Sequence, residues 1–255
     1  MTTVLETADL RKEFGELVAV DDVSLSIDGD DITSIIGPNG AGKTTFYNLL
    51  TGVLEPTSGS IRLRKDGDLL DITDAPPHEV ARSGLSRSYQ ITNIFEGITV
   101  RENVQVARIV HERQTLDVFS RPSADEDLNA DVDELLELTN LTEFSETPCE
   151  ELSHGEKRNV EIALALAIEP TVFLLDEPTA GMNPTETRKV VSLIRQLNED
   201  IDATFVVTEH NMDVVTDISD RIVVLAEGAV LADGEPEAVL ADERVTEAYL
   251  GSEAI

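Results

Sequence analysis

The sequence predicts an α/β fold built on a parallel β-sheet. Apolar runs of strand length occur at residues 33–36, 172–175 and 203–208, and each is followed by a glycine-rich or polar stretch. Buried parallel strands have this pattern, with their carboxyl ends at a ligand crevice. Segments with helical apolar spacing follow at residues 44–54 and 184–197, as expected where strands alternate with helices.

The stretch between the first strand and the first helix is rich in glycine. Residues 37–44 read G-P-N-G-A-G-K-T and fit G-x-x-x-x-G-K-[ST], a phosphate-binding loop. Glycines let the backbone approach an anion closely, and the free N–H groups of a helix N-terminus attract it. Lys43 would reach the β- and γ-phosphates of a nucleoside triphosphate, and the Thr44 hydroxyl would hold Mg²⁺. A chance glycine-rich turn is the alternative, and the loop alone does not name the reaction.

Two acids, Asp176 and Glu177, end the apolar run at 172–175. Adjacent carboxylates at the end of a buried strand are costly unless a cation or water lies beside them. One can hold Mg²⁺, and the other can orient and deprotonate a water molecule. A solvated strand end is the alternative. His210 follows the run at 203–208 and is a candidate γ-phosphate sensor, although a lone histidine is usually structural.

The remaining elements follow from local patterns. Ser153 and Glu156 have the spacing of a capping box at the start of an apolar helix. Phe14 lies between the first two strands, and packing in a turn or in the core would account for an aromatic residue at this position. We expect strands at 3–11, 17–27, 61–64 and 85–90, helices at 76–84, 99–113, 129–141 and 152–168, a hairpin at 222–231 and short helices at 235–250.

The composition is strongly acidic. The 255 residues include 51 Asp and Glu against 19 Lys and Arg, a formal charge of −32. An acidic surface is typical of a host with a salt-rich cytoplasm, and it disfavours nucleic acid as a partner. With no apolar run long enough to span a bilayer and no signal-peptide pattern, we expect a soluble cytoplasmic chain. The single Cys149 is expected to be an ordinary thiol without an internal disulfide.

Five segments in this order resemble the ATP-binding cassette (ABC) ATPases over essentially the whole chain. Residues 37–44 resemble Walker A, Gln90 the Q-loop glutamine, 152–156 the LSGGQ signature, 172–177 Walker B with its catalytic glutamate, and His210 the switch histidine. Residues 180–183 are similar to the D-loop, and Phe14 then resembles the aromatic residue that stacks on adenine. The resemblance implies a P-loop core with an antiparallel β subdomain and an inserted α-helical subdomain.

The resemblance also implies roles for individual residues, with ATP and Mg²⁺ as the bound groups. The catalytic residues would be Glu177, His210 and Lys43. ATP would be bound by Phe14, Gly37, Pro38, Asn39, Gly40, Ala41, Gly42, Lys43, Thr44 and Thr45, and Mg²⁺ would be bound by Thr44, Gln90 and Asp176. The residues that act on the ATP of a second cassette would be Ser153, His154, Gly155 and Glu156. His154 and Glu156 depart from the first Gly and the Gln of LSGGQ, which leaves their effect on rate open. The single nucleotide-binding domain would comprise a core of 1–90 and 165–234, a helical part of about 91–164 and a helical tail of 235–255.

Finer features are similar to importer ATPases for branched-chain amino acids. They lie at residues 89–95, 99–104, 176–184, 209–212, 218–222 and 248–251. Urea and short-chain amide importers have ATPases nearly as similar, and lipopolysaccharide exporters are more distant. The resemblance implies an ATPase at the cytoplasmic face of the membrane, with permease subunits, a second identical or different cassette and, indirectly, a solute-binding protein. A soluble ABC ATPase of the iron–sulfur assembly type is the alternative.

Overall fold

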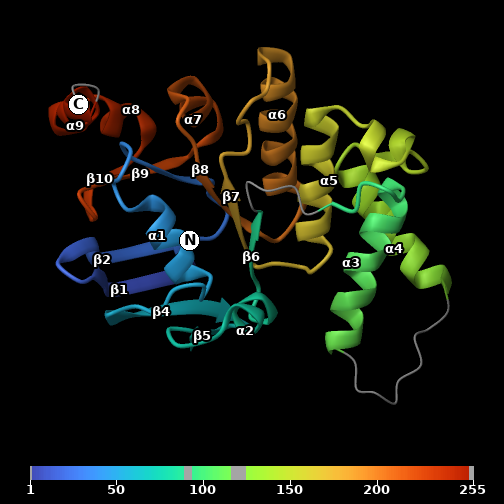
Figure 1. Ribbon diagram of the computed structural model, residues 1–255, viewed down its shortest axis with the longest axis horizontal. Helices are drawn as coiled ribbons and strands as arrows, with labels where there is room; N and C mark the ends of the chain where they lie inside the picture. Colours follow the sequence, from blue (N-terminus) through green and yellow to red (C-terminus); the bar gives the residue numbers. More distant parts are fainter. Residues whose placement is uncertain (1, 89–93, 116–124, 253–255) are drawn as a thin grey trace. The chain divides into compact units, whose positions relative to one another are not determined.

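The computed structural model describes residues 2–88, 94–115 and 125–252 (Figure 1). The chain forms two compact units. The first consists of Met1–Arg87, Thr171–Pro178 and Asn198–Ile255, and the second of Ser88–Pro170 and Thr179–Leu197. The helical unit therefore includes a segment after the acid pair that the sequence analysis assigned to the core.

Two β-sheets organise the first unit. Their strands are β1 (Thr3–Phe14), β2 (Leu17–Asp28), β3 (Thr33–Ile36), β4 (Ser58–Lys65), β5 (Asp68–Asp71), β6 (Leu85–Ser88, whose last residue belongs to the second unit), β7 (Val172–Asp176), β8 (Thr204–Thr208), β9 (Arg221–Ala226) and β10 (Ala229–Gly234). One sheet is antiparallel, in the order β2-β1-β4-β5, and the other has the order β10-β9-β3-β8-β7-β6. In the second sheet, β3 pairs in parallel with β9 and β8, and β8 pairs in parallel with β7. The predicted fold class is confirmed.

The strand order brings three functional segments to one edge. The carboxyl ends of parallel strands lie at the same edge of a sheet. The glycine-rich loop follows β3, the acid pair ends β7, and His210 follows β8. These segments are far apart in the sequence and meet because β3, β8 and β7 are neighbours.

Helix α1 packs its apolar face into the main core of this unit. Its residues Phe46, Tyr47, Leu49 and Leu50 join one buried cluster with residues of both sheets. The helices of this unit are α1 (Lys43–Leu50), α2 (Pro77–Arg82), α7 (Met212–Ile218), α8 (Pro236–Leu240) and α9 (Glu243–Ser252), together with the end of α6 (Pro184–Asp200). A separate cluster packs Val245 and Tyr249 of α9 against residues that include Ile36, which precedes the glycine-rich loop. The C-terminal helices thus support the strand that carries that loop.

The second unit is helical. It contains α3 (Val100–Thr115), α4 (Asp125–Leu138), η1 (Thr142–Phe144), η2 (Cys149–Glu151), α5 (His154–Leu166) and most of α6. Its core draws on α3, α4 and α5, which lie side by side (Figure 1). Cys149 is fully buried in this core, where burial raises the pKa of its thiol. It is a packed thiol, as expected.

Element boundaries differ from the sequence assignments where backbone geometry intervenes. The helix expected at 44–54 ends at Leu50, because Gly52 has a φ of 68°. The helix expected at 152–168 starts at His154, with Ser153 as its N-cap. The strand expected at 85–90 is described as far as Ser88.

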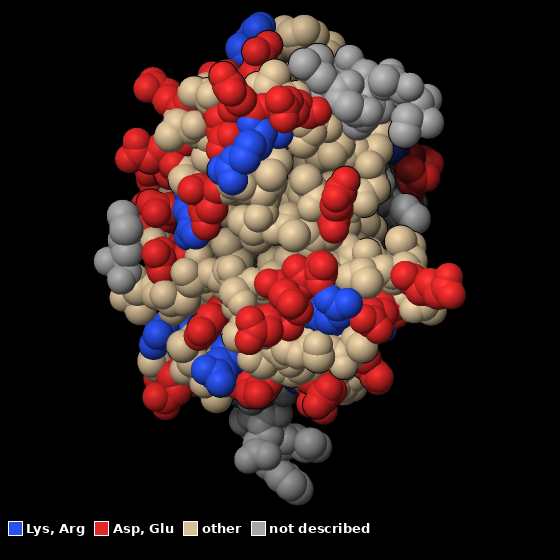
Figure 2. Space-filling view, turned by 90° about the vertical axis from the view of Figure 1, so that its left-hand side faces the viewer, with Lys and Arg blue, Asp and Glu red and all other residues tan. Residues whose placement is uncertain are grey.

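Acidic side chains are spread over the surface. On the face in Figure 2, Asp and Glu outnumber Lys and Arg and occur in small groups rather than in one patch. Among the described residues, no helix combines the length and apolar character needed to cross a bilayer.

Candidate functional site

The glycine-rich loop turns sharply between β3 and α1. Gly42 is the N-cap of α1 with a φ of 100°, and Gly40 has a φ of 80°. A Cβ on Gly37 would collide with the carbonyl oxygen of Leu225, and one on Gly42 would collide with that of Ala19. The backbone can therefore follow this path only with glycine at these positions.

Lys43 lies over the loop. Its Nζ donates to the carbonyl oxygens of Gly37, at 2.5 Å, and Pro38, at 3.1 Å. Burial lowers the pKa of Lys43, while the charges of Glu177 and Asp176 act in the opposite direction. A partly desolvated ammonium beside free N–H groups at a helix start suits a polyphosphate.

Thr208, at the end of β8, organises the acid pair. Its hydroxyl donates to Asp176 Oδ1 at 2.6 Å. The backbone N–H of Glu177 donates to the Thr208 carbonyl oxygen at 3.0 Å and contacts its hydroxyl at 3.2 Å. Glu177 has a φ of 45°, a left-handed conformation that is uncommon for a non-glycine residue.

Glu177 and His210 contact each other directly. Glu177 Oε1 lies 2.9 Å from His210 Nε2. The side chain of Glu177 is 26 % exposed and that of His210 is 46 % exposed, so water and substrate can reach both. A carboxylate oriented by an imidazole is suited to hold a water molecule and accept its proton.

The other ATP-binding candidates lie on helix α1 and at the end of strand β1. Thr44 and Thr45 belong to the first turn of α1, and the Thr44 side chain is exposed. Phe14 ends β1 and is 46 % exposed, with Lys12 Nζ 5.3 Å from its ring centroid. Gln90 lies outside the described residues.

The signature candidates belong to the second unit. Ser153 caps α5, and the side chain of Glu156 accepts from the Ser153 backbone N–H at 2.7 Å, which completes the capping box. His154 Nε2 lies 3.3 Å from the carbonyl oxygen of Ala180, in the segment likened to a D-loop. Ser153 and His154 are exposed.

Sequence reasoning missed two residues of the site. Arg87 donates to Asp176 Oδ2 at 2.6 Å, and Thr208 holds the other oxygen. The only signal for Thr208 was its position at the end of a buried strand. Nothing in the sequence around Arg87 indicates that it contacts Asp176.

The residues at this edge fit ATP and Mg²⁺. Gly37 and Gly42 leave a backbone cradle that any Cβ would obstruct, and the start of α1 supplies N–H donors. The Thr44 hydroxyl and the Asp176 carboxylate are hard oxygen ligands of the kind that Mg²⁺ prefers.

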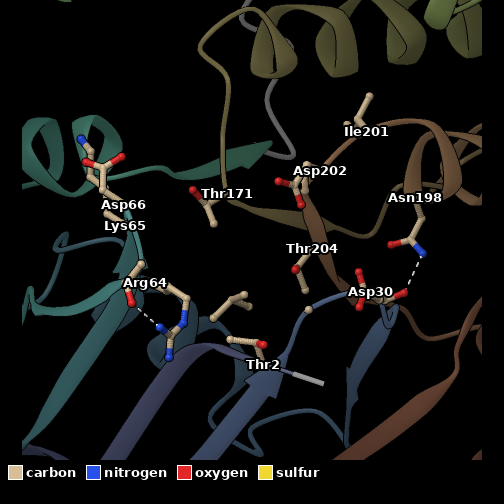
Figure 3. Close-up of a pocket in the computed structure, with 14 residues that line it drawn as sticks. Thr2, Asp30, Arg64, Lys65, Asp66, Thr171, Asn198, Ile201, Asp202 and Thr204 are labelled. Atoms are coloured by element: carbon tan, nitrogen blue, oxygen red, sulfur yellow. Dashed lines mark hydrogen bonds between the residues drawn. The ribbon is translucent and has the colours of Figure 1, made fainter.

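A cavity of about 480 Å³ lies elsewhere in the first unit (Figure 3). Its lining includes Thr171 and Thr204, at the amino ends of β7 and β8. Arg64 lies on its other side, where it donates to the carbonyl oxygen of Gly67. The cavity is thus at the opposite edge of the sheet from Glu177 and His210.

Comparison with known proteins agrees with this geometry. Residues 20–180 match the family described as ABC transporter, and residues 229–255 match the branched-chain amino acid ATP-binding cassette transporter family. The chain is 40 % identical over 253 residues to the high-affinity branched-chain amino acid transport ATP-binding protein BraF of Pseudomonas aeruginosa, with 97 % of this chain and 98 % of BraF covered.

Solved structures extend the likeness to the fold. The ADP conformation of MJ1267, an ATP-binding cassette of an ABC transporter, is 31 % identical with a TM-score of 0.84, covering 98 % of this chain and 100 % of that one. A dimeric cassette, MJ0796 bound to ADP and Pi, is 27 % identical with a TM-score of 0.73, covering 91 % and 98 %. The chain therefore belongs to the ABC transporter family and is an ATPase of that family.

Proposed function

We propose that this ATPase drives an importer for branched-chain amino acids from the cytoplasmic face of the membrane. The observation that carries the proposal is the match of residues 229–255 to the branched-chain amino acid cassette family, together with the full-length similarity to BraF. Urea or short-chain amides are the alternative solutes, because the sequence features that favour amino acids occur in those importers too.

In the proposed hydrolysis, Glu177 holds the attacking water and accepts its proton. His210 would fix the Glu177 carboxylate through the 2.9 Å contact and would stabilise the transferring γ-phosphate. Lys43 and the N–H groups of the loop bind the phosphates. Thr44 and Asp176 would hold Mg²⁺, which supplies positive charge to the phosphate oxygens.

A second cassette completes the proposed site. Ser153 and Gly155, at the N-terminus of α5, would face the γ-phosphate bound by the partner and stabilise its charge. The related cassette MJ0796 forms a dimer when it is bound to ADP and Pi, which supports pairing of two cassettes. Binding of two ATP molecules would close the dimer, and hydrolysis would let it open.

The proposed permease contact lies on the second unit, near residues 90–104. Phe95 is 60 % exposed, and Val106 and Val110 of α3 are 41 % and 48 % exposed. Exposed apolar side chains of this size on one unit favour a surface that receives a partner. A permease segment docked here would sense the site through Gln90.

The test is purification of the tagged chain from gently solubilised native membranes at high salt, followed by mass spectrometry. We expect a multi-span permease, a second cassette and a solute-binding protein that binds leucine, isoleucine or valine. The permease should not copurify with the Phe95→Asp variant. It should still copurify with the control variant Val53→Asp, which alters an exposed residue of the first unit. Recovery of soluble assembly proteins alone would refute the transport assignment, and a binding protein for urea or amides would change the solute.

A further inference from the structure

Arg87 is a buried cation inside the nucleotide site. It lies in β6, and its side chain is only 6 % exposed. The guanidinium lies 5.4 Å from the ring centroid of Tyr47. A buried charge is costly unless hydrogen-bonded partners compensate it, so the contacts of Arg87 indicate why it is there.

The guanidinium connects the two elements that carry the proposed Mg²⁺ ligands. Nη2 donates to Asp176 Oδ2 at 2.6 Å, and Nη1 donates to Asn48 Oδ1 at 2.8 Å. Asn48 is four residues after Thr44 in α1, so both lie on the same side of that helix. Arg87 therefore fixes the Asp176 carboxylate relative to the helix that begins with the phosphate-binding lysine.

Both oxygens of Asp176 are hydrogen-bonded. Thr208 holds Oδ1 at 2.6 Å and Arg87 holds Oδ2 at 2.6 Å. Both contacts hold the carboxylate in one orientation. The full positive charge of Arg87 therefore lies at hydrogen-bond distance from the carboxylate that is proposed to serve Mg²⁺.

We propose that Arg87 is a positioning residue that acts as the counter-ion of Asp176 and makes Mg²⁺ binding conditional on nucleotide. The inference rests on the proposed assignment of Thr44 and Asp176 to Mg²⁺. Without nucleotide, Arg87 neutralises Asp176 and repels a divalent ion. The phosphates of ATP then supply the negative charge that overcomes this repulsion, so metal and nucleotide bind together.

The test measures the binding of Mn²⁺ to the nucleotide-free protein by electron paramagnetic resonance. Arg87→Met should bind Mn²⁺ at least about tenfold more tightly than the wild type, because a unit charge a few ångströms from a divalent ion is removed. The kcat for ATP hydrolysis should fall, since Asp176 loses its orientation, and half-maximal activity should need less Mg²⁺.

Three variants separate charge from structure. Arg87→Lys keeps the charge and should bind Mn²⁺ as weakly as the wild type, and Asn48→Ala, which leaves the ion pair with Asp176 intact, should do the same. Arg87→Gln removes the charge but retains hydrogen-bond donors, and it should share the tight binding if Arg87→Met folds poorly. Mn²⁺ affinities of Arg87→Met and Arg87→Gln equal to the wild type would overturn the proposal.

The source of any gain in affinity is checked with a second substitution. Asp176→Asn in the Arg87→Gln background should abolish the gain, and its persistence would place the ion elsewhere and overturn the proposal. Failure of the proposed function has a different signature, since the purification from native membranes would then recover no permease while the Mn²⁺ affinities of these variants stayed as expected.

Discussion

At the scale of single residues, Thr208 links the two acids that the sequence presents as adjacent. It holds Asp176 through its hydroxyl and Glu177 through its backbone carbonyl oxygen. The carboxylates thereby diverge, one toward Arg87 and the other toward His210. Two neighbouring acids with different partners can take different roles, one holding a cation and the other acting as a base.

Glu177→Gln should retain ATP binding and lose turnover. The amide has the same shape and can still contact His210, but it cannot accept the proton of the attacking water. We expect kcat to fall by at least roughly 10²-fold. ATP should then hold the variant as a dimer, measured by light scattering on a sizing column. The matched control is Glu199→Gln on the exposed side of α6, and near-normal turnover of the Glu177 variant would refute its role as the base.

At the scale of elements, the start of α5 shows how one pattern can serve structure and function. Ser153 and Glu156 form the capping box that their spacing predicted. The cap accounts for both residue types without any ligand. The exposure of Ser153 nevertheless leaves its hydroxyl accessible to a partner molecule, so the two roles must be separated by substitution.

Ser153→Ala should lower the free energy of unfolding by about 0.5–2 kcal/mol, the usual cost of a lost N-cap. Urea denaturation would measure it. Ser153→Asp keeps an N-cap acceptor and should retain stability, yet it should abolish ATP hydrolysis because its carboxylate would face the partner's γ-phosphate. If Ser153→Asp hydrolyses ATP at the wild-type rate, Ser153 has a capping role alone.

At the scale of the whole molecule, the net charge of −32 works against compactness. The acidic groups are distributed, and most described Arg side chains already have acidic partners, as in the ion pairs of Arg221 with Asp233 and Arg108 with Asp131. The excess negative charge therefore repels itself over the surface. Dissolved salt is the available means of screening it.

Thermal stability should rise with KCl concentration between 0.1 and 2 M. The screening length falls from about 10 Å at 0.1 M to about 3 Å at 1 M, which weakens repulsion between surface carboxylates. Differential scanning fluorimetry would measure the midpoint. A variant with four exposed glutamates changed to glutamine (Glu143, Glu199, Glu237 and Glu247) should show a smaller rise. Equal rises in the two proteins would contradict screening of surface charge as the cause.

The elements that depend on local pattern can be predicted from the sequence. The glycine spacing of 37–44 requires a tight strand-to-helix turn, and the apolar run before Asp176 requires a buried strand. The S-x-x-E spacing places a helix start at Ser153. These features follow from backbone sterics and hydrophobic period, which act within a few residues. The family resemblance added the predicted roles of Phe14 and His210.

Which of these segments lie next to one another depends on the three-dimensional fold. The order β9-β3-β8-β7 depends on long-range parallel pairing, which leaves no local signal in the chain. It brings Lys43 near Asp176 and Glu177, and it sets Thr208 between the two acids. In the sequence, Arg87 is only a polar residue in a short strand. In the fold, β6 belongs to that sheet, and the buried charge of Arg87 is compensated by Asp176.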